Sequence, residues 1–423
     1  MQYDTYWLDT APPFVSGCRA PDDRYDVVVI GGGFTGLCAA LTLARSGVKV
    51  AVLEAGRVIG EASGRNGGQC NTGVAQDYAG LVARLGRERA KRYYRTFAEA
   101  VASVEAVIDE ASIDCDYQRN GKLKLAAKPA HYEQLVRSGE AIRRDVDADV
   151  ELLTAQELRA EIGSSHFHGG LLQKNSGQMH MGRFGVGLAE AAAQQGAHIV
   201  EHTPMTGYCR EAGGFRLTTP EGEVKAENLL LATGTSRHGP LGWFRRRLVP
   251  VGSFVVVTEP LSPELCQRLL PGRRACVTSR IIGNYFRLTP DNRLLFGGRA
   301  RFAMSGGASD AKSGDILRRA LVAIFPQLDG VRLDYCWGGL VDMSRDRLPH
   351  AGRHEGMYYV MGFSGHGVQM SVHMGRLMAE AMLGQRDEFP WQETRWRAIP
   401  GHFGKPWFLP LAGGWYRLQD RLH

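Results

Sequence analysis

The stretch Asp26–Glu54 constrains the fold of this chain more than any other part of it. An apolar strand ending at Ile30 is followed by glycines in G-x-G-x-x-G spacing, a helix that reaches Arg45, and a second apolar strand that ends on Glu54. The first glycine permits a tight turn, the second lets the backbone approach a pyrophosphate, and the third lets the helix pack closely on the strand. The helix start attracts phosphate, and the terminal carboxylate can accept ribose hydroxyls. The unit therefore predicts a dinucleotide site formed by Gly31, Gly33, Phe34, Thr35, Gly36 and Glu54.

Length and composition restrict the remaining possibilities. A chain of 423 residues exceeds one ordinary core, so two domains or one discontinuous pair are expected. The net charge of +7 is spread out, and no basic run is longer than Arg245–Arg247, which argues against nucleic-acid binding. The eight cysteines form no C-x-x-C pair, so reduced thiols in a cytoplasm are expected instead of a disulfide framework or a metal site. Neither a signal peptide nor a membrane-spanning apolar run is expected.

A second glycine-rich stretch, Gly60–Gln69, follows the dinucleotide unit. Its glycines cannot support a packed helix. Two interpretations remain, a flexible surface loop or a backbone that wraps a bound cofactor. The small, weakly charged composition favours the second.

These two stretches together carry a family resemblance. Gly31–Glu54 followed by A-S-G-R-N-G-G-Q at Ala62–Gln69 resembles the FAD-dependent amine and amino-acid oxidases of the glycine oxidase/D-amino-acid oxidase superfamily, and most of all the γ-glutamylputrescine oxidoreductases. The likeness continues through Asn228–Gly234, Tyr335–Pro349 and Gly356–Gly367. It implies FAD as the cofactor. It also implies that FAD contacts include Ser63, Gly64, Arg65, Asn66, Gly67, Gly68, Gln69, Met205, Ala232, Thr233, Gly234, Gly338, Gly362, Ser364, Gly365, His366, Gly367 and Val368.

The fold class expected from the pattern and the resemblance is α/β, mixed with α+β. A discontinuous Rossmann-type FAD-binding domain is combined with a second, substrate domain built on an antiparallel sheet. We expect the FAD-binding domain to comprise 1–76, 156–249 and 326–388, and the substrate domain to comprise 77–155 and 250–325.

The tail, 389–423, is rich in aromatic residues and interrupted by prolines. It could be an interfacial membrane element, or it could pack on its own domain or on a second subunit. The prolines disfavour a long amphipathic helix, which favours packing and leaves a homodimer open.

The chemistry is expected to be the cofactor's, because the chain shows no Ser-His-Asp order, metal-ligand cluster or P-loop. In the resembled family a hydride passes from the carbon beside a nitrogen to flavin N5, and the imine hydrolyses to an aldehyde and an amine. Each active-site candidate has an ordinary alternative as a core or helix-cap residue. The candidates are His366, Trp337, Tyr285, Arg287 and His180.

The resemblance also bears on how the flavin is held. Sarcosine oxidase relatives attach it through a cysteine about seven residues before the aspartate of the D-x-x-P segment. Gly339 occupies that place here, and Cys336 is out of register. Non-covalent FAD is therefore expected.

The sequence says less about the substrate than about the cofactor. Amino-acid oxidases of the superfamily generally fix a carboxylate with an arginine, but the loop after the second glycine stretch offers Gly68, Gln69 and Asn71. This favours an amine without a nearby carboxylate, such as a polyamine or a γ-glutamyl polyamine. The arginines that could still supply the contact are Arg183, Arg287 and Arg299.

Two other functions stay open. One is oxidation of an α-amino acid of the glycine, sarcosine or D-amino-acid type, and the other is electron delivery or a tRNA-modification step. The electron acceptor is O2 or a respiratory acceptor. Related oxidases place a lysine near the flavin for oxygen reduction, yet no lysine falls in 226–311.

Overall fold

The apolar strand expected at the start of the dinucleotide unit is the centre of an eight-stranded sheet, the first sheet. This computed structural model describes residues 1–74, 76–298, 307–387, 395–404 and 406–422. The main path runs β17-β18-β11-β1-β2-β8, and the antiparallel strands β10 and β9 branch from β11. Its strands are β1 (Arg24–Ile30), β2 (Val50–Leu53), β8 (His198–Val200), β9 (Gly207–Glu211), β10 (Gly214–Thr219), β11 (Gly222–Leu231), β17 (His350–His354) and β18 (Met357–Met361).

A second eight-stranded sheet runs in the order β16-β12-β15-β14-β13-β4-β6-β5. All its neighbours pair antiparallel except β4 and β13, so the expected antiparallel sheet is confirmed with one parallel pair. Its strands are β4 (Lys122–Leu125), β5 (Glu151–Thr154), β6 (Gly169–Gln173), β12 (Leu248–Thr258), β13 (Ala275–Thr278), β14 (Asn284–Leu288), β15 (Leu294–Gly298) and β16 (Leu333–Ser344). A short ribbon of β3 (Gln69–Cys70) and β7 (Gly177–Gln178) completes the strands.

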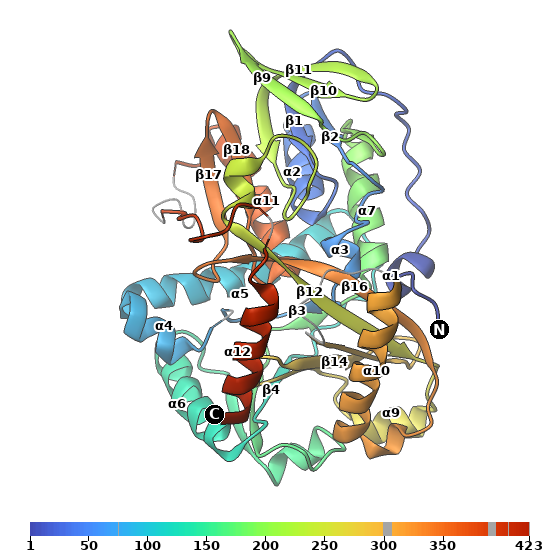
Figure 1. The fold of residues 1–423 in the computed structure, drawn as a ribbon, viewed down its shortest axis with the longest axis vertical. Coiled ribbons are helices and arrows are strands. Elements are labelled where there is room, and N and C mark those ends of the chain that lie inside the picture. The colour runs from blue at the N-terminus through green and yellow to red at the C-terminus, as the bar shows by residue number, and fades with distance from the viewer. Residues whose placement is uncertain (75, 299–306, 388–394, 405, 423) are drawn as a thin grey trace.

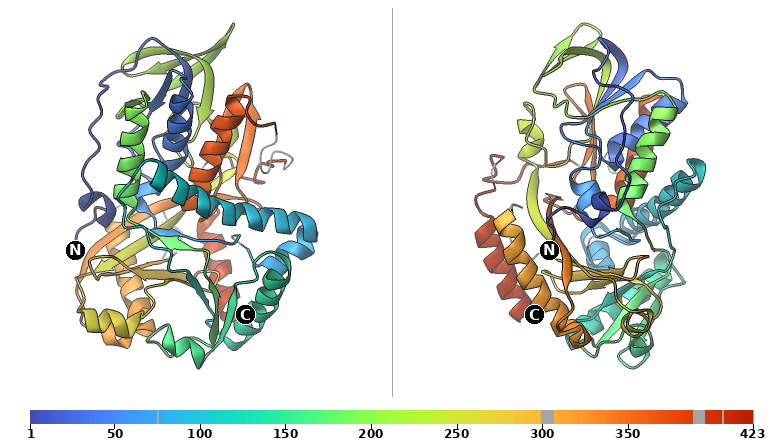
Figure 2. Two further views of the ribbon diagram at one scale, coloured as in Figure 1. Left: turned by 180° about the vertical axis from the view of Figure 1, so that it is seen from behind. Right: turned by 90° about the vertical axis from the view of Figure 1, so that its right-hand side faces the viewer.

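Helices cover both sheets. In Figure 1 the first sheet, with α2, α7 and α11, forms the upper part of the molecule, and the second sheet, with α9, α10 and α12, forms the lower part. Figure 2 shows the same two parts from behind and from the side. The helices are α1 (Tyr6–Asp9), α2 (Phe34–Arg45), α3 (Ala62–Arg65), α4 (Tyr78–Leu85), α5 (Arg87–Glu110), α6 (Pro129–Asp145), α7 (Met181–Gln194), α8 (Gly242–Arg245), α9 (Pro263–Leu269), α10 (Gly307–Ile324), α11 (Gly367–Met382) and α12 (Leu409–Leu422), with 3-10 turns at Glu157–Ala160 and Pro326–Leu328.

The strand pairing divides the chain differently from the expected domain boundaries at two places. β6 was expected in the FAD-binding part, but it pairs with β4 and β5 of the second sheet. β16 was expected there too, but it pairs with β12 along the length of both strands. Apolar runs identify a strand without identifying its partner, which explains both differences.

The second sheet has two unlike faces. Tyr285 and Arg287 lie on the inner face, toward the first sheet, whereas Phe286 lies on the outer face and packs edge-on against Phe325 at 5.3 Å. The predicted alternation along this strand is confirmed, and the structure supplies the side that the pattern left open.

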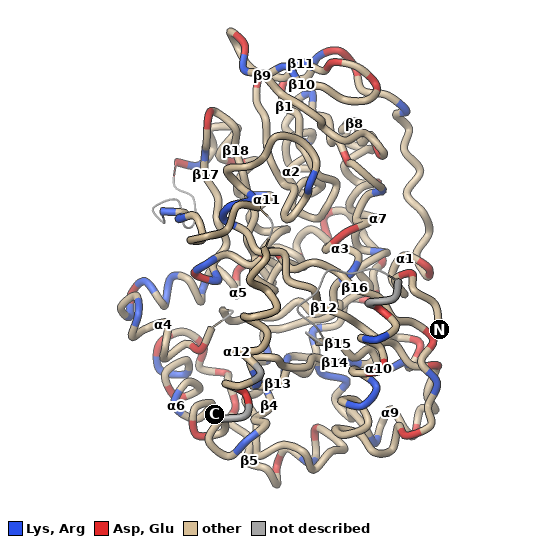
Figure 3. Tube along the Cα trace, in the orientation of Figure 1, with Lys and Arg blue, Asp and Glu red and all other residues tan. Residues whose placement is uncertain are grey.

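Charged residues of both signs are interspersed over the chain in the view of Figure 3. Within the part of the chain that the structure describes, no helix is long and apolar enough to cross a membrane.

Candidate active site

A cavity of about 1530 Å³ opens between the two sheets. Drug-sized ligands occupy pockets of about 300–1,000 Å³, so this volume leaves room for a dinucleotide and a second, smaller molecule. One end, the glycine-rich half, is lined from within Gly31–Thr35, Glu54–Gly67, Ala232–His238 and Phe363–Gly367. The other end, the lysine half, is lined by Gly73, Val74, Gln76, Asp77, Tyr78, Tyr94, Lys122, Lys124, Leu171, Gln173 and residues of α6.

The turn after β1 presents backbone to the glycine-rich half. Gly31 has a φ of 110°, and a Cβ there would lie 2.7 Å from the carbonyl oxygen of Ala232. A Cβ on Gly36 would collide with the carbonyl oxygen of Gly31, so glycine is required where α2 packs on the turn. The N-cap residue of α2, Gly33, provides no side-chain hydrogen bond. Gly33, Phe34 and Thr35 at the start of the helix line the cavity, and the Phe34 N–H donates to Ser63 Oγ.

Glu54 closes the edge of this turn. Its Oε2 accepts from the Gly32 N–H at 2.6 Å and its Oε1 from the Gly56 N–H at 2.7 Å. Burial raises the pKa of Glu54, although the two backbone N–H groups oppose that rise. Each oxygen has further lone pairs, so the fixed carboxylate can still accept hydroxyl groups from a ligand.

The loop that carries α3 is fastened on both sides. Arg65 donates to the carbonyl oxygens of Gly60 at 2.8 Å and Gly338 at 2.9 Å, and Asn66 Oδ1 accepts from the Gly68 N–H at 2.9 Å. Ser63 Oγ accepts from the Phe34 N–H at 3.1 Å, which ties the loop to the start of α2. The second glycine-rich stretch therefore lies along the cavity as an ordered wall.

The far wall is the turn before α11. Ser364, Gly365, His366, Gly367 and Val368 all line the cavity, so α11 begins there. The N-terminal end of a helix carries a partial positive charge, which this wall directs into the cavity.

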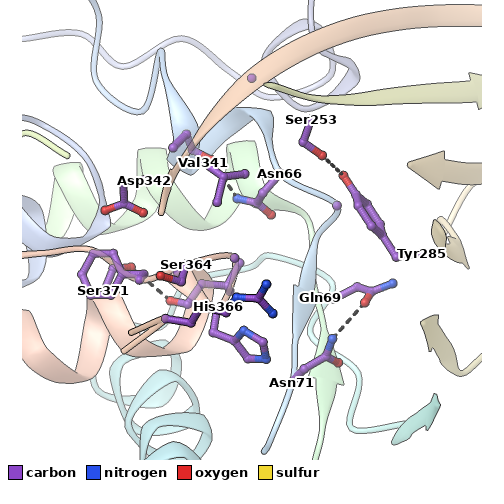
Figure 4. Close-up of a pocket in the computed structure, with 18 of the residues that line it drawn as sticks. Asn66, Gln69, Asn71, Ser253, Tyr285, Val341, Asp342, Ser364, His366 and Ser371 are labelled. Carbon is purple, nitrogen blue, oxygen red and sulfur yellow. Dashed lines mark hydrogen bonds between the residues drawn. The ribbon is translucent and has the colours of Figure 1, made fainter. Parts of the chain in front are cut away.

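Asp342 supports that turn from β16. Its Oδ2 accepts from the Gly362 N–H at 2.6 Å, and burial raises the pKa of Asp342 to about 6. Figure 4 shows Asp342, Ser364 and His366 on one side of the space and Tyr285 on the other.

The predicted cofactor residues divide into two groups. Most of them line the cavity, including Glu54, Met205 and the Ala232–Gly234 turn. Five glycines, 36, 64, 68, 338 and 362, lie behind the wall.

Of the five catalytic candidates, the structure brings two into the cavity. His366 lines it at the N-terminus of α11. Tyr285 lies with its ring against the backbone of Gly67, and its hydroxyl is 3.3 Å from Ser253 Oγ.

The other three candidates lie outside the cavity lining. Trp337 is fully buried, and its Nε1 donates to the Arg65 carbonyl oxygen at 3.0 Å. Arg287 is also buried and donates to the carbonyl oxygens of Gly68 and Met179. His180 caps α7, accepting from the Arg183 N–H at 3.2 Å, and burial lowers its pKa to about 4. Trp337 and Arg287 thus hold the wall in place, whereas His180 fixes the start of α7.

Sequence reasoning missed many cavity residues with polar side chains, among them Asp77, Lys122, Lys124 and Asp342. The alternation K-L-K-L over 122–125 was a readable signal, because it places both lysines on one face of a strand and both leucines on the other. A lone aspartate late in an apolar strand is the weaker signal at Asp342.

A family model described as FAD-dependent oxidoreductase (DAO) matches residues 26–381, which span both sheets. The chain belongs to this DAO family. Among its relatives, the γ-glutamylputrescine oxidoreductase of Escherichia coli (strain K12) is 33% identical over 410 residues, covering 94% of this chain and 93% of that protein. The glycine oxidase of Bacillus licheniformis is 26% identical over 390 residues, covering 88% and 96%.

Solved structures agree on the fold of this DAO-family chain. The crystal structure of glycine oxidase from Geobacillus kaustophilus superimposes with a TM-score of 0.71 at 22% identity, covering 90% of this chain and all of that one. The protein is thus an FAD-dependent oxidoreductase with a Rossmann-type domain and a second domain, as the sequence predicted.

Proposed function

We propose that the glycine-rich half holds the FAD of this family. Close backbone approach at Gly31, the start of α2 at the cavity wall and the fixed carboxylate of Glu54 fit a pyrophosphate with its adenosine ribose. The start of α11 fits the flavin edge that becomes negative on reduction. No cysteine of the described residues lines the cavity, and Cys336 lies in the outer core with its Sγ 3.1 Å from the Asp310 carbonyl oxygen.

The FAD is therefore proposed to be non-covalent. Acid precipitation should release the yellow colour into the supernatant, measured by absorbance. Flavin that stays with the precipitated protein would contradict this arrangement.

The reaction proposed is oxidation of a carbon–nitrogen bond in an amine, with a polyamine or γ-glutamyl polyamine as substrate. Water hydrolyses the imine to an aldehyde and an amine, which is ammonia where the oxidised nitrogen is a primary amine. When bound, the flavin accepts a hydride from the carbon beside the nitrogen. The relative named as a γ-glutamylputrescine oxidoreductase supports this class of substrate.

The preference for amines over α-amino acids is supported by the two described arginines that the sequence offered for a substrate carboxylate, because neither lines the cavity. The arginines that do line it are Arg57, Arg65, Arg137, Arg237, Arg280 and Arg347. Arg183 pairs with Asp116 at 2.9 Å, and Arg287 is taken up by backbone carbonyl oxygens, so neither of these arginines reaches the cavity. Arg299 lies outside the described residues. Beside Tyr285 the cavity instead presents two amides, Gln69 and Asn71.

Asn71 is the residue we assign to orient the substrate nitrogen. Its Nδ2 donates to Gln69 Oε1 at 2.9 Å, and its carbonyl oxygen accepts from Gln369 Nε2 at 2.6 Å. Its Oδ1 is buried and has no hydrogen-bond partner within the described residues. A substrate N–H can satisfy that oxygen. Desolvation of the amine against the ring of Tyr285 favours the neutral amine, which is the form that can be oxidised.

Turnover with a panel of substrates tests this proposal. γ-Glutamylputrescine, putrescine, glycine and D-alanine would be supplied with oxygen and, separately, with a soluble quinone, and the products identified by mass spectrometry. Aldehyde formed from the amines supports the proposal. Turnover of the amino acids alone would replace it with the second candidate function, α-amino-acid oxidation, which the glycine oxidase relative favours.

A further inference from the structure

The lysine half contains two cations on one strand. Lys122 and Lys124 are two residues apart on β4, and both line the cavity. Leu123 and Leu125 point to the other face of the strand and pack in the hydrophobic core on the outer face of the second sheet. β6 continues the face that bears the lysines, because Gln173 lies opposite Lys122 and Leu171 lies opposite Lys124. The second sheet therefore presents paired ammonium groups to the cavity.

Within the described residues neither ammonium group forms an ion pair, although the Asp77 carboxylate is near enough to raise the pKa of Lys124. Lys122 is 8% exposed, and its Nζ donates to the Thr72 carbonyl oxygen at 2.7 Å. Among the described residues, no carboxylate oxygen lies within 4.0 Å of either lysine. Burial lowers the pKa of both lysines, to about 7 for Lys122, whose neighbour Lys124 adds to the effect. Burying an unpaired cation is costly, so the arrangement is typical of a site completed by a ligand.

One acidic side chain faces the same space. Asp77 Oδ2 caps α4 by accepting from the Gly80 N–H at 3.0 Å. Its Oδ1 is buried and has no hydrogen-bond partner among the residues described. The lysine half thus combines the two lysines and Arg137 of α6 with one carboxylate oxygen that lacks a hydrogen bond, which complements a group that carries both a carboxylate and an ammonium.

Strand pairing gives the distance from Lys124 to Tyr285, beside which the substrate amine is proposed to lie. Lys124 lies opposite Val277 on β13, and Val277 lies opposite Tyr285 on β14. Neighbouring strands are about 4.8 Å apart, so the backbones at Lys124 and Tyr285 are separated by about 10 Å. An extended chain gains about 3.3–3.6 Å for every three bonds, so about nine bonds cover that distance.

Resting on the proposed function, we propose that Lys122 and Lys124 bind a carboxylate of the substrate and that Asp77 binds the ammonium beside it. The enzyme would then take amines whose far end is an α-amino acid head group, about nine bonds from the nitrogen at the oxidised carbon. A γ-glutamyl diamine meets this description, and a free diamine does not.

Three matched substrates test the proposal on the FAD-loaded protein. γ-Glutamylputrescine carries the carboxylate and the ammonium, N-glutarylputrescine the carboxylate alone, and N-butyrylputrescine neither. The ratio of kcat/KM for glutaryl to butyryl substrate reports the lysines, and the ratio for γ-glutamyl to glutaryl substrate reports Asp77. Each ratio is expected to be about 10–100, the range of a charge-assisted contact.

Variants show which residue is responsible for each kcat/KM ratio. Lys124→Met should bring the first ratio close to one, and Lys124→Arg should retain most of it. Asp77→Asn, which can still cap α4, should bring the second ratio close to one. Lys174→Met is the matched control, because Lys174 follows Gln173 directly but pairs with Glu151 outside the cavity.

Calorimetry with γ-glutamylbutylamide separates this proposal from the proposed function, because that probe lacks the terminal amine. Binding that weakens about 10–100-fold in Lys124→Met supports the head-group site even if no amine is turned over. Equal ratios in wild type and Lys124→Met, or a Lys124→Met effect confined to the reaction with oxygen, would overturn it.

Discussion

The two halves of the cavity are built in opposite ways. The glycine-rich half is made of backbone, with turns, helix starts and loops drawn together where side chains are absent. The lysine half is made of side chains that reach the same space from β4, β6, α6 and the loop before α4. The first half has a shape that suits one cofactor, whereas the second has charges that select among substrates. Similar backbones can therefore hold FAD while the substrate changes with a few side chains.

The largest expected effect comes from a substitution in the glycine-rich half. Gly36→Ala places a Cβ against the Gly31 carbonyl oxygen, so α2 must move away from β1. We expect a loss of about 3 kcal/mol or more in the free energy of unfolding and a protein that retains no flavin after gel filtration. Gly17→Ala is the control, because a Cβ there has no atom within 4 Å. Full flavin content in Gly36→Ala would show that the close approach is not needed.

Glu54→Ala should have the next largest effect. It removes the acceptor proposed for the adenosine ribose and leaves the Gly32 and Gly56 N–H groups without their partner. FAD affinity, measured by fluorescence titration of the apoprotein, should fall about 10–100-fold. Glu54→Gln keeps the size of the side chain and should lose less. Unchanged affinity in both variants would count against the ribose contact.

These two predictions rest on features that were visible in the sequence, and the reason is local. The glycine spacing, the helix start and Glu54 lie within one continuous stretch, so their roles do not depend on distant pairing. The lysine half could not be assembled in this way. Lys122 acquires its position from the pairing of β4 with β6 and β13, and the sequence did not reveal that β6 belongs to the second sheet.

The same contrast explains why some of the catalytic candidates lie outside the cavity lining. Arg287 and Tyr285 alternate correctly on β14, yet only Tyr285 reaches the cavity, because the carbonyl oxygens of Gly68 and Met179 hold the guanidinium behind the wall. That choice depends on tertiary contacts and not on strand periodicity.

Asn71 lies where the two halves meet, and its substitution tests the proposed hydrogen bond between the substrate amine and Asn71 Oδ1. Asn71→Leu has a similar size but cannot accept the substrate N–H at Oδ1. We expect KM for the amine to rise about tenfold, while FAD content is kept. Steady-state kinetics with γ-glutamylputrescine measure this effect. An unchanged KM would move the amine contact to another residue, with Gln69 as the next candidate.

The smallest expected effect concerns the stability that the folded protein loses by burying Lys122. Burial lowers the pKa of Lys122 to about 7, below the ordinary value of about 10.4. Between these values the unfolded chain binds more protons than the folded protein, so stability rises with pH and the cost is fully present below about pH 7. Lys122→Met should therefore raise Tm by about 2–4 °C at pH 6–7, with a smaller gain near pH 10.

Thermal unfolding of both proteins across that pH range measures the difference. An equal loss of Tm at every pH would mean that the bond from Lys122 to Thr72 is structural and that the lysine carries no penalty.

The most direct test of the central claim, that one cavity joins an FAD site to a site for amines with a charged head group, is the anaerobic rate at which substrates bleach the visible flavin absorbance. We predict that γ-glutamylputrescine bleaches it faster than putrescine, and that glycine and D-alanine are slower than either. Bleaching by the amino acids with no response to γ-glutamylputrescine would contradict the claim.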